Sequence, residues 1–272
     1  MGQRKALTAE EEKIIIDAYT KEKRGQIYCG NLVGVGVRVV KAVLKKHGIH
    51  IRNFSEAATE SNQNRKHEVN DEYFNRESHN MAYIMGFLAA DGHIHQKDNR
   101  IEIGLSSVDT EFLETIRKEL GIENEVKISQ TSNGYEQCRL SFSSSKIKQS
   151  LANYGIGYDK TYNLALPKNL SKEYMIDFIR GYFDGDGSVS TAGNSAIRWQ
   201  VCSATKGILE EIVIFLKEEY DIPTVSVLET TRKNPLYYIQ YSTVSTRKIF
   251  DILYTPESLF LPRKYEKFKN II

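Results

Sequence analysis

Apolar residues in the first fifty positions recur at the spacing of amphipathic helices. The stretch "TAEEEKIIIDAYTKEK" places Thr8 before three acids and then sets apolar residues three and four positions apart. A capping residue, acids in the first turn and one apolar face together predict a helix that begins after Thr8. A second short helix is predicted at residues 25–33 and a third at residues 37–48, with a break at Gly34.

The apolar periodicity is lost between residues 53 and 77, where Asn, Ser, Glu and Arg predominate. Such a stretch is typical of a connector between domains. We therefore expect an all-α domain over residues 1–52 and a linker over residues 53–77.

Beyond the connector, one order of elements occurs twice. Helical periodicity at residues 79–92 is followed by two strand-like runs, a helix, two more strand-like runs and a helix, and the same order begins again at residue 172. The pattern predicts two αββαββα units, at residues 78–166 and 167–272. The expected fold class is α+β, with a small all-α domain before a duplicated domain.

Matching residues in the two copies lie at a nearly constant offset of 95 or 96 positions. Three pairs share it: Gly86 with Gly181, Asp91 with Asp186, and Ser107 with Ser203. A duplication of this kind predicts a monomer in which matching helices meet on an internal pseudo-two-fold axis.

Composition narrows the classes of protein that fit the chain. It has 272 residues, 40% of them hydrophobic, which suffices for one large core or two smaller ones. No apolar run has the roughly 18 to 20 residues that a membrane span needs, and the first residues match neither a secretion signal nor a myristoylation pattern. Cys29, Cys138 and Cys202 form no C-x-x-C pair, which favours the cytoplasm of a bacterial, archaeal or phage-infected cell.

The formal net charge of +2 is unevenly distributed. Residues 1–70 hold 13 Lys and Arg and 8 Asp and Glu, a net charge of +5, whereas residues 71–272 hold 24 and 27, a net charge of −3. The basic N-terminal quarter favours a polyanionic partner for that region.

The N-terminal quarter also resembles the helix-turn-helix of DNA-binding proteins, including small resolvase-like modules that end in a tail such as "GIHIR". The alternative is a three-helix bundle with a solvated basic face. The resemblance implies DNA contacts from four basic residues: Arg38, Lys41, Lys45 and Arg52.

The helix ends "IMGFLAADG" and "IRGYFDGDG" carry the candidate chemistry. Each helix end has two small residues four positions apart, Gly86 and Ala90 in the first and Gly181 and Gly185 in the second. Small residues on one helical face let two helix backbones approach closely. Asp91 and Asp186 would then stand side by side at helix C-termini, where the macrodipole and the neighbouring carboxylate both oppose ionisation. A divalent cation relieves both penalties, and hard oxygen ligands favour Mg²⁺ and hydrolysis of a phosphodiester.

A calcium loop of the EF-hand type does not fit the second of these ends. A loop that starts at Asp184 requires Gly at its sixth position and Glu at its twelfth. The chain has Val189 and Ser195 at those positions, which excludes the EF-hand.

His93 and His95 lie on one face of a strand beside Asp91 and could belong to a zinc site. The second copy has Ser188 and Ser190 at those positions. We therefore interpret the histidines as exposed or as facing DNA.

The two helix ends resemble the paired motifs of single-chain LAGLIDADG homing endonucleases, and the similarity extends over the whole duplicated region. The resemblance implies two αββαββα units whose sheets form a saddle on the DNA major groove. It also implies a metal-dependent double-strand cut at a specific DNA site, with Mg²⁺ as the cofactor and Mn²⁺ or Ca²⁺ as substitutes. Asp91 and Asp186 would bind the metal, one for each strand, with the carbonyls of Ala90 and Gly185 as further ligands.

The resemblance implies catalytic roles for four residues outside the motifs. Lys160 and Lys264 follow the last helix of each copy, where the family places a basic residue that positions solvent or stabilises developing charge. Ser107 and Ser203 end the second strand of each copy, where many relatives carry a polar residue that orients water.

The two motif copies differ at one acidic position, which is Ala89 in the first and Asp184 in the second. In the family the later aspartate is the catalytic one. The difference therefore predicts unequal halves, with unequal cutting rates, and leaves both sites in place.

Contacts to DNA are expected from polar residues on the strands and hairpins of the saddle. These are Gln96, Lys97, Arg100, Lys127, Arg139, Arg198, Arg232 and Lys233. The acids gather on the outer helices instead, so the binding face can be positive although residues 71–272 carry a net negative charge.

Two other functions stay open. LAGLIDADG folds joined to a helix-turn-helix also occur in transcription regulators that have lost the catalytic acids, and the third possibility is an RNA-splicing maturase. The retained aspartates and lysines favour the nuclease. The chain lacks the terminal residues of an intact intein, so we expect a free-standing, intron-encoded or phage-encoded enzyme.

Overall fold

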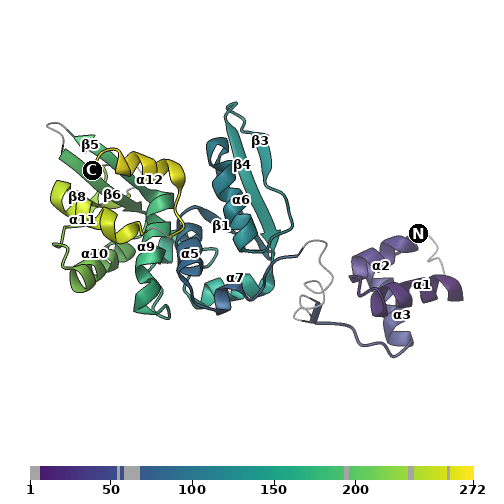
Figure 1. Ribbon diagram of the computed structural model, residues 1–272. Coiled ribbons are helices and arrows are strands. Elements are labelled where there is room, and N and C mark those ends of the chain that lie inside the picture. Colours follow the sequence, from purple (N-terminus) through teal and green to yellow (C-terminus); the bar gives the residue numbers. More distant parts are fainter. Residues whose placement is uncertain (1–6, 54–55, 58–67, 193–195, 232–235, 256–257) are drawn as a thin grey trace. The chain divides into compact units, whose positions relative to one another are not determined.

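The computed structural model describes residues 7–53, 56–57, 68–192, 196–231, 236–255 and 258–272. The chain divides into two compact units, Met1–Lys66 and His67–Ile272, which we call unit 1 and unit 2 (Figure 1). Arg232 and Lys233, two of the predicted DNA contacts, lie outside the described residues.

Unit 1 contains three helices: α1 (Ala9–Thr20), α2 (Gln26–Leu32) and α3 (Val37–Lys46). α1 begins as predicted, because Thr8 Oγ1 accepts a hydrogen bond from the Glu11 N–H and the Glu11 carboxylate accepts one from the Thr8 N–H. Gly34, at φ +71°, takes the left-handed conformation in the turn between α2 and α3, which are bent by 95°.

The three helices of unit 1 enclose a small core that includes Ile15, Val40 and Leu44. Glu12 of α1 links to α3 outside this core, where its carboxylate accepts from Lys46 Nζ at 2.8 Å. In the described part of the chain, no single helix is long and apolar enough to cross a membrane, and only the bent pair α2 and α3 reaches that length and composition together.

Arg52 follows the three helices of unit 1 and packs back against them. Its guanidinium lies over the Tyr19 ring and donates to the carbonyl oxygens of Tyr19, Lys23 and Arg24. The structure thus directs this predicted DNA contact toward the backbone of unit 1. The other three predicted contacts are exposed on α3: Arg38, Lys41 and Lys45.

Packing in unit 2 starts earlier than the predicted first copy. Phe74, in the 3₁₀ helix η1 (Tyr73–Asn75), is buried, and the Asn70 N–H donates to the Leu120 carbonyl. Residues 68–77 of the predicted linker therefore pack against unit 2, because an aromatic side chain inside the polar stretch enters its core.

The rest of unit 2 confirms the predicted repeat of elements. The first copy comprises α5 (His79–Asp91), β1 (Gly92–Ile94), β2 (Arg100–Ser106), η2 (Ser107–Asp109), α6 (Thr110–Glu119), β3 (Lys127–Gln130), β4 (Glu136–Ser143) and α7 (Ser145–Asn153). The second comprises α9 (Lys172–Asp186), β5 (Gly187–Ala192), β6 (Ala196–Ser203), α10 (Lys206–Tyr220), β7 (Leu228–Glu229), β8 (Tyr237–Ser242) and α11 (Thr243–Leu253).

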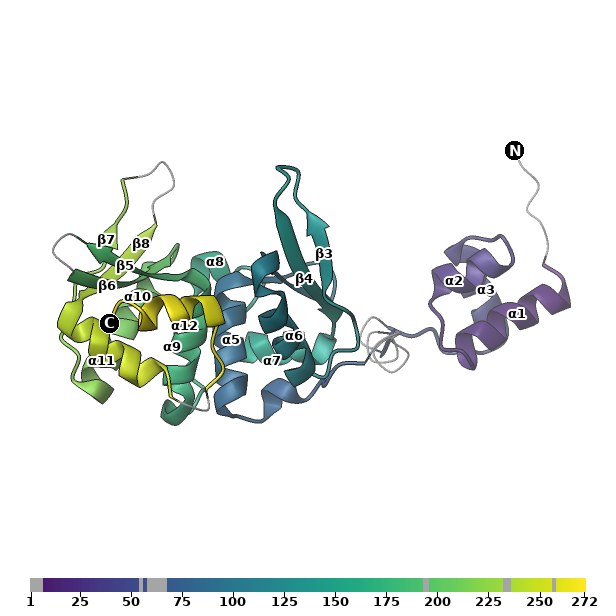
Figure 2. The ribbon, with the colours of Figure 1, turned by 45° about the horizontal axis from the view of Figure 1, so that its top comes forward.

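Each copy forms one antiparallel four-stranded sheet with the same topology, β1-β2-β4-β3 in the first and β5-β6-β8-β7 in the second. Strand residues alternate between core and surface: Ile101 and Ile103 of β2 are buried, as are Trp199 of β6 and Tyr241 of β8. Figure 2 shows the two sheets on either side of α5 and α9, with the β3–β4 and β7–β8 strands projecting on the same side.

Two further helices were not expected from the sequence pattern. They are α8 (Lys160–Asn163) and α12 (Pro262–Lys269). α8 is a single turn, and α12 is mostly polar, so neither shows a clear apolar periodicity. Their position matters for the site, because each begins at or near a predicted catalytic lysine.

The helices α5 and α9 pack backbone against backbone about the predicted pseudo-two-fold axis. A Cβ added to Gly86 would overlap the Phe178 carbonyl, and one added to Gly181 would overlap the Tyr83 carbonyl. Tyr83 and Phe178 are themselves a matched pair, 95 residues apart, so the contact is reciprocal, as in a two-fold dimer.

Candidate active site

The two motif aspartates stand at adjacent helix ends. Asp91 is the last residue of α5 and Asp186 the last residue of α9, and both are exposed. A Cβ added to Gly185 would overlap the Ala90 side chain and lie 3.3 Å from Asp91 Oδ2. The structure therefore brings together all four residues that the sequence predicts as metal ligands.

The surroundings of both carboxyl groups favour their protonated form. Although both side chains keep accessible surface, the surrounding protein removes part of their hydration; this desolvation raises the pKa of Asp186 to about 6, and the charge of Asp91 adds to that rise. Desolvation likewise raises the pKa of Asp91, against the opposing charges of Lys264 and Lys160. Two carboxylates that each resist ionisation form a site that favours a bound cation.

Each predicted catalytic lysine caps one motif helix. Lys160, in α8, donates to the carbonyl oxygens of Ala89 and Ala90 at 2.7 and 2.9 Å. Lys264, in α12, donates to the carbonyl oxygens of Phe183, Asp184, Gly185 and Gly187 at 2.9, 2.6, 3.3 and 2.7 Å. An ammonium group at a helix C-terminus is stabilised by the macrodipole and satisfies carbonyls that have no partner within the helix.

Burial shifts both lysines toward the neutral form. It lowers the pKa of Lys264 to about 8, although the charge of Asp184 opposes the shift. Burial also lowers the pKa of Lys160, against the charges of Asp186 and Asp91. Because the aspartate charges oppose these shifts, each lysine interacts electrostatically with the aspartate pair.

One half of the site is a pocket of 280 Å³ in which three predicted catalytic residues meet: Asp186, Lys160 and Ser203. Ser203 is buried, and its Oγ accepts the Thr205 N–H at 3.0 Å. Tyr182 and Cys202 also line this pocket. The pocket combines residues from both copies, with Lys160 from the first and Asp186 from the second.

Ser107 occupies a different environment from Ser203. It is the first residue of η2, and its Oγ donates to Glu136 Oε2 at 3.5 Å. Its predicted match with Ser203 is therefore limited to position in the chain, and the structure gives the two serines different partners.

Asp184 has a structural function that the sequence did not reveal. Its buried carboxylate accepts hydrogen bonds from Tyr83 Oη at 2.9 Å, Tyr254 Oη at 3.0 Å and the Leu261 N–H at 2.8 Å. Burial raises the pKa of this carboxyl, and the Leu261 N–H opposes the rise. The residue fastens the segment that leads into α12, whereas the matching Ala89 has no polar side chain.

Asp109 and Arg263 were also missed by sequence reasoning. Arg263 Nε donates to both carboxylate oxygens of buried Asp109, at 2.9 and 2.8 Å, and thereby joins α12 of the second copy to η2 of the first. The one signal in the sequence was the position of Arg263 directly before Lys264.

The donor set of the site fits Mg²⁺. Two aspartate carboxylates and the carbonyls at the helix ends are hard oxygen donors, and Mg²⁺ uses one or two carboxylates together with water and substrate phosphate. Ala90 and Gly185 already accept from the lysines, but a carbonyl oxygen has a second lone pair. Within the described ranges, no cluster of three or more His, Cys, Asp or Glu side chains is arranged as a metal site, so substrate would have to complete the shell.

Predicted DNA contacts gather on the outer face of the first sheet. Arg139 of β4 pairs with Lys127 of β3 on one side and with Gly104 of β2 on the other. Gln96 and Lys97 lie in the exposed β1–β2 turn, and three carbonyls of residues 95–98 accept hydrogen bonds from Lys148.

The remaining predicted contacts are also exposed. Arg100 of β2 donates to His95 Nδ1 at 3.1 Å, and Arg198 of β6 is flanked by Ser190 and Ser242 on the neighbouring strands. In the described part of the second sheet, neutral polar side chains lie beside Arg198.

The two histidines beside Asp91 are bound to protein groups. His95 Nε2 lies 2.9 Å from Glu102 Oε2, and the rings of His93 and His95 meet edge to face at 4.4 Å. His93 is an exposed residue of β1, as interpreted, whereas His95 follows the strand and is only partly exposed.

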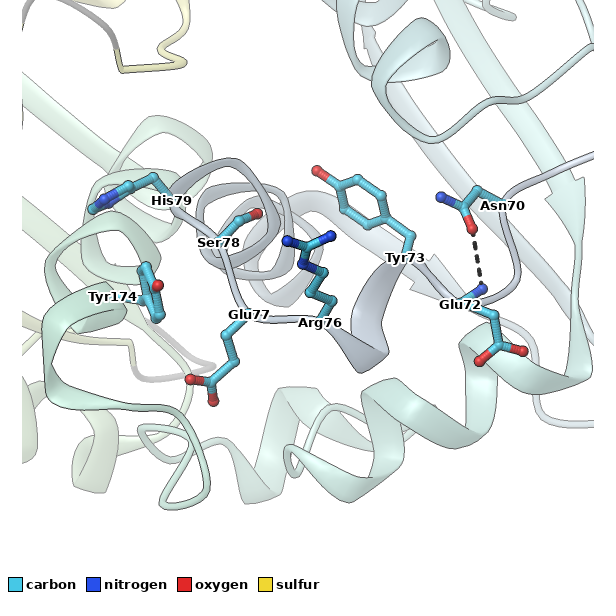
Figure 3. A pocket seen from close by; sticks show the side chains of 8 residues that line it. All are labelled: Asn70, Glu72, Tyr73, Arg76, Glu77, Ser78, His79 and Tyr174. Carbon is cyan, nitrogen blue, oxygen red and sulfur yellow. Dashed lines mark hydrogen bonds between the residues drawn. The ribbon is translucent and has the colours of Figure 1, made fainter.

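A separate pocket of 540 Å³ lies beside the N-terminal ends of α5 and α9 (Figure 3). Asp91 and Asp186 end the same two helices and lie at their opposite ends. The lining of the pocket includes Arg76, His79 and Tyr174. None of the predicted site residues lines it.

Comparison with known proteins places this geometry in a family. The profile of the LAGLIDADG-like domain matches residues 78–155 and 173–252, together more than half of the chain. A probable translation initiation factor of Methanocaldococcus jannaschii is 30% identical over 111 residues, which are 37% of this chain and 9% of that protein. The chain thus corresponds to less than a tenth of this relative's length.

Two solved structures are among those to which the chain is similar. The N-terminal LAGLIDADG domain of WhiA is 18% identical, with a TM-score of 0.46, and the match covers 82% of this chain and 98% of that domain. The homing endonuclease I-WcaI, solved with its DNA recognition sequence, is 11% identical, with a TM-score of 0.47, and the match covers 81% and 97%. Since the family profile matches each of the two copies, the chain belongs to the LAGLIDADG family and carries its domain twice.

Proposed function

We propose that this protein is a site-specific DNA endonuclease that makes a metal-dependent double-strand cut. The observation that carries the proposal is the meeting of Asp91 and Asp186 at the ends of two packed helices, with a lysine at each end. A transcription regulator of the same fold would have no need of paired carboxylates whose ionisation is opposed by burial and by one another.

The proposed reaction is hydrolysis of a phosphodiester. The oxygen of a water molecule bonds to phosphorus, one ester P–O bond breaks, and the leaving oxygen takes up a proton while the attacking water loses one. Mg²⁺ bound by Asp91 and Asp186 would supply Lewis-acid stabilisation of the phosphate. Lys160 and Lys264 place positive charge where negative charge develops, and their low pKa also suits them to exchange a proton with water.

Unit 1 would extend the DNA contact as a helix-turn-helix. Its support is the short turn at Gly34, the bend of 95° between α2 and α3, and the exposed basic residues of α3. The three residues Arg38, Lys41 and Lys45 are the proposed contacts, and Arg52 would act only by holding unit 1 together.

The test begins with a library of DNA duplexes that carry a randomised central segment. The full chain is incubated with the library in Mg²⁺ or in EDTA, and the cut ends are sequenced. We expect one preferred sequence, cut on both strands only in Mg²⁺, and no cut by Asp186→Asn. Recovery of one tightly bound sequence that stays intact in Mg²⁺ would identify a regulator and overturn the proposal.

A further inference from the structure

We propose that Arg263 is a catalytic residue of only one of the two half-sites, where it binds the phosphate beside Asp91, and that Asp109 positions it. This inference rests on the proposed nuclease function. It assigns to the two half-sites different means of stabilising the transition state.

The first argument is the way in which Arg263 is held. Asp109 is 4% exposed, and both of its carboxylate oxygens accept a hydrogen bond from Arg263 Nε. The side chain of Arg263 remains 53% exposed, and within the described parts of the chain its two terminal nitrogens have no hydrogen-bond partner. A guanidinium fixed at Nε, with both terminal nitrogens accessible, is prepared to donate two parallel hydrogen bonds to a phosphate.

The second argument is location. Arg263 directly precedes Lys264 in α12, and Lys264 Nζ lies against the C-terminus of α9. Asp109 lies in η2, which directly follows β2, and β2 pairs with the strand that begins at Gly92, the residue after Asp91. The hydrogen bonds to Asp109 therefore hold Arg263 on the copy that carries Asp91.

The third argument is that the other half-site lacks this pair. The residue before Lys160 is Asp159, whose carboxylate accepts a hydrogen bond from Asn163. The position that matches Asp109 is Thr205, whose hydroxyl donates to the carbonyl of Thr161 at 3.0 Å. In both half-sites a hydrogen bond joins the lysine-bearing helix to the opposite copy. Only the bond between Asp109 and Arg263 involves a positively charged side chain.

The inference predicts strand-selective effects. The substrate is the duplex recovered from the library, with a different fluorescent label on each strand. Lys160→Met is expected to slow one strand, because Lys160 lines the pocket of Asp186. Arg263→Ala is expected to slow the other strand by about 100-fold, the usual cost of losing one transition-state donor. The unaffected strand in each variant reports that the protein is folded.

Further variants separate positioning from general stability. Asp109→Asn is expected to slow the same strand as Arg263→Ala by about tenfold, and Arg263→Lys to restore part of the rate, because it keeps the charge without the fork. Lys267→Ala, which removes an exposed cation from the same helix, is the matched control and leaves both strands unchanged. Equal slowing of both strands, or slowing of the strand that Lys160→Met affects, would overturn the proposal.

A second readout does not depend on cleavage. Binding of the same duplex is measured in EDTA over a range of salt concentrations, where the slope of log K against log salt changes by about 0.9 for each lost phosphate contact. Arg263→Ala is expected to reduce the slope by that amount and Lys267→Ala to preserve it. If the wild type binds DNA without cutting it, the proposed function is wrong, and the slope alone decides whether Arg263 contacts phosphate.

Discussion

The two copies of the duplicated domain hold the same proposed catalytic side chains through different contacts. Asp91 and Asp186 end matching helices, and Lys160 and Lys264 cap them. In the second copy the lysine is 7% exposed and bonds four carbonyls, whereas in the first it is half-buried and bonds two.

The comparison separates what the two copies share from what they do not. The shared aspartate and lysine are the residues that the proposed cation site would need, because two carboxylates bind the cation and a positive charge complements each carbonyl end. The supports around them differ: Asp184 stands where the first copy has Ala89, and Asp109, which bonds Arg263, stands where the second copy has Thr205. Asp184 holds the segment that leads into α12, whereas Asp109 leaves the terminal nitrogens of Arg263 for the proposed phosphate contact.

The largest expected effect comes from removing one carboxylate. Asp91→Asn and Asp186→Asn are each expected to reduce double-strand cutting by at least about 1,000-fold. The two carboxylates would act as one unit, so that losing either costs about as much activity as losing both. Because the folded pKa of Asp186 lies above its unfolded value, the ionised carboxylate costs stability above pH 6. The Asn variant is therefore expected to melt no lower than the wild type at pH 8 in EDTA. Retention of near-normal double-strand cutting by either variant would show that the copies are not equivalent in chemistry.

The second prediction concerns the unequal supports. Asp184→Asn replaces one of the two accepting oxygens with an NH₂ group, and it is expected to lower the free energy of unfolding by about 3 kcal/mol because at least one buried donor loses its acceptor. Ala89→Asp, the matched exchange in the first copy, is expected to destabilise at least as much, since a buried carboxylate there is unpaired. Urea denaturation measures both. If Asp184→Asn leaves the free energy of unfolding unchanged, this hydrogen-bond network does not stabilise the second copy.

A third prediction concerns the interface at which the copies are equal. Gly86→Ala and Gly181→Ala are each expected to destabilise by about 2 kcal/mol, because the new methyl group meets backbone atoms that cannot move without separating α5 and α9. Gly104→Ala is the control, since a Cβ there meets nothing within 4 Å. Thermal denaturation of the three variants compares them. A difference of more than about 1 kcal/mol between Gly86→Ala and Gly181→Ala would contradict the reciprocal packing.

The order of elements and the motif residues could be predicted from the sequence because both depend on local pattern. Strand alternation identified β2, β4, β6 and β8, and the spacing of Gly86 and Asp91 identified the packed end of α5. Because the offset between the copies is nearly constant, a residue identified in one copy indicates its counterpart in the other.

The supports could not be predicted because they join residues far apart in the chain. Asp184 bonds Leu261 across 77 positions, and Asp109 bonds Arg263 across 154. Neither pair leaves a periodic signal. The contacts of Arg52 could not be predicted for a related reason: a basic residue beside a helix-turn-helix pattern suggests DNA, and the sequence does not show that its guanidinium donates to carbonyls at and just beyond the end of α1.

The smallest expected effect tests how closely the two copies are coupled. In EDTA, the Asp186 carboxyl is expected to titrate near pH 6, and in Asp91→Asn it is expected to titrate at a lower pH, because the neighbouring negative charge that raises its pKa is gone. Carboxyl ¹³C NMR follows the titration directly. The sign of the stability effect gives an independent check: a raised folded pKa means that the wild type gains stability as the pH falls through 6, and Asp91→Asn should gain less. An Asp186 titration that is unchanged in Asp91→Asn would mean that burial alone sets the pKa, and that the two copies meet at their helices without sharing one electrostatic site.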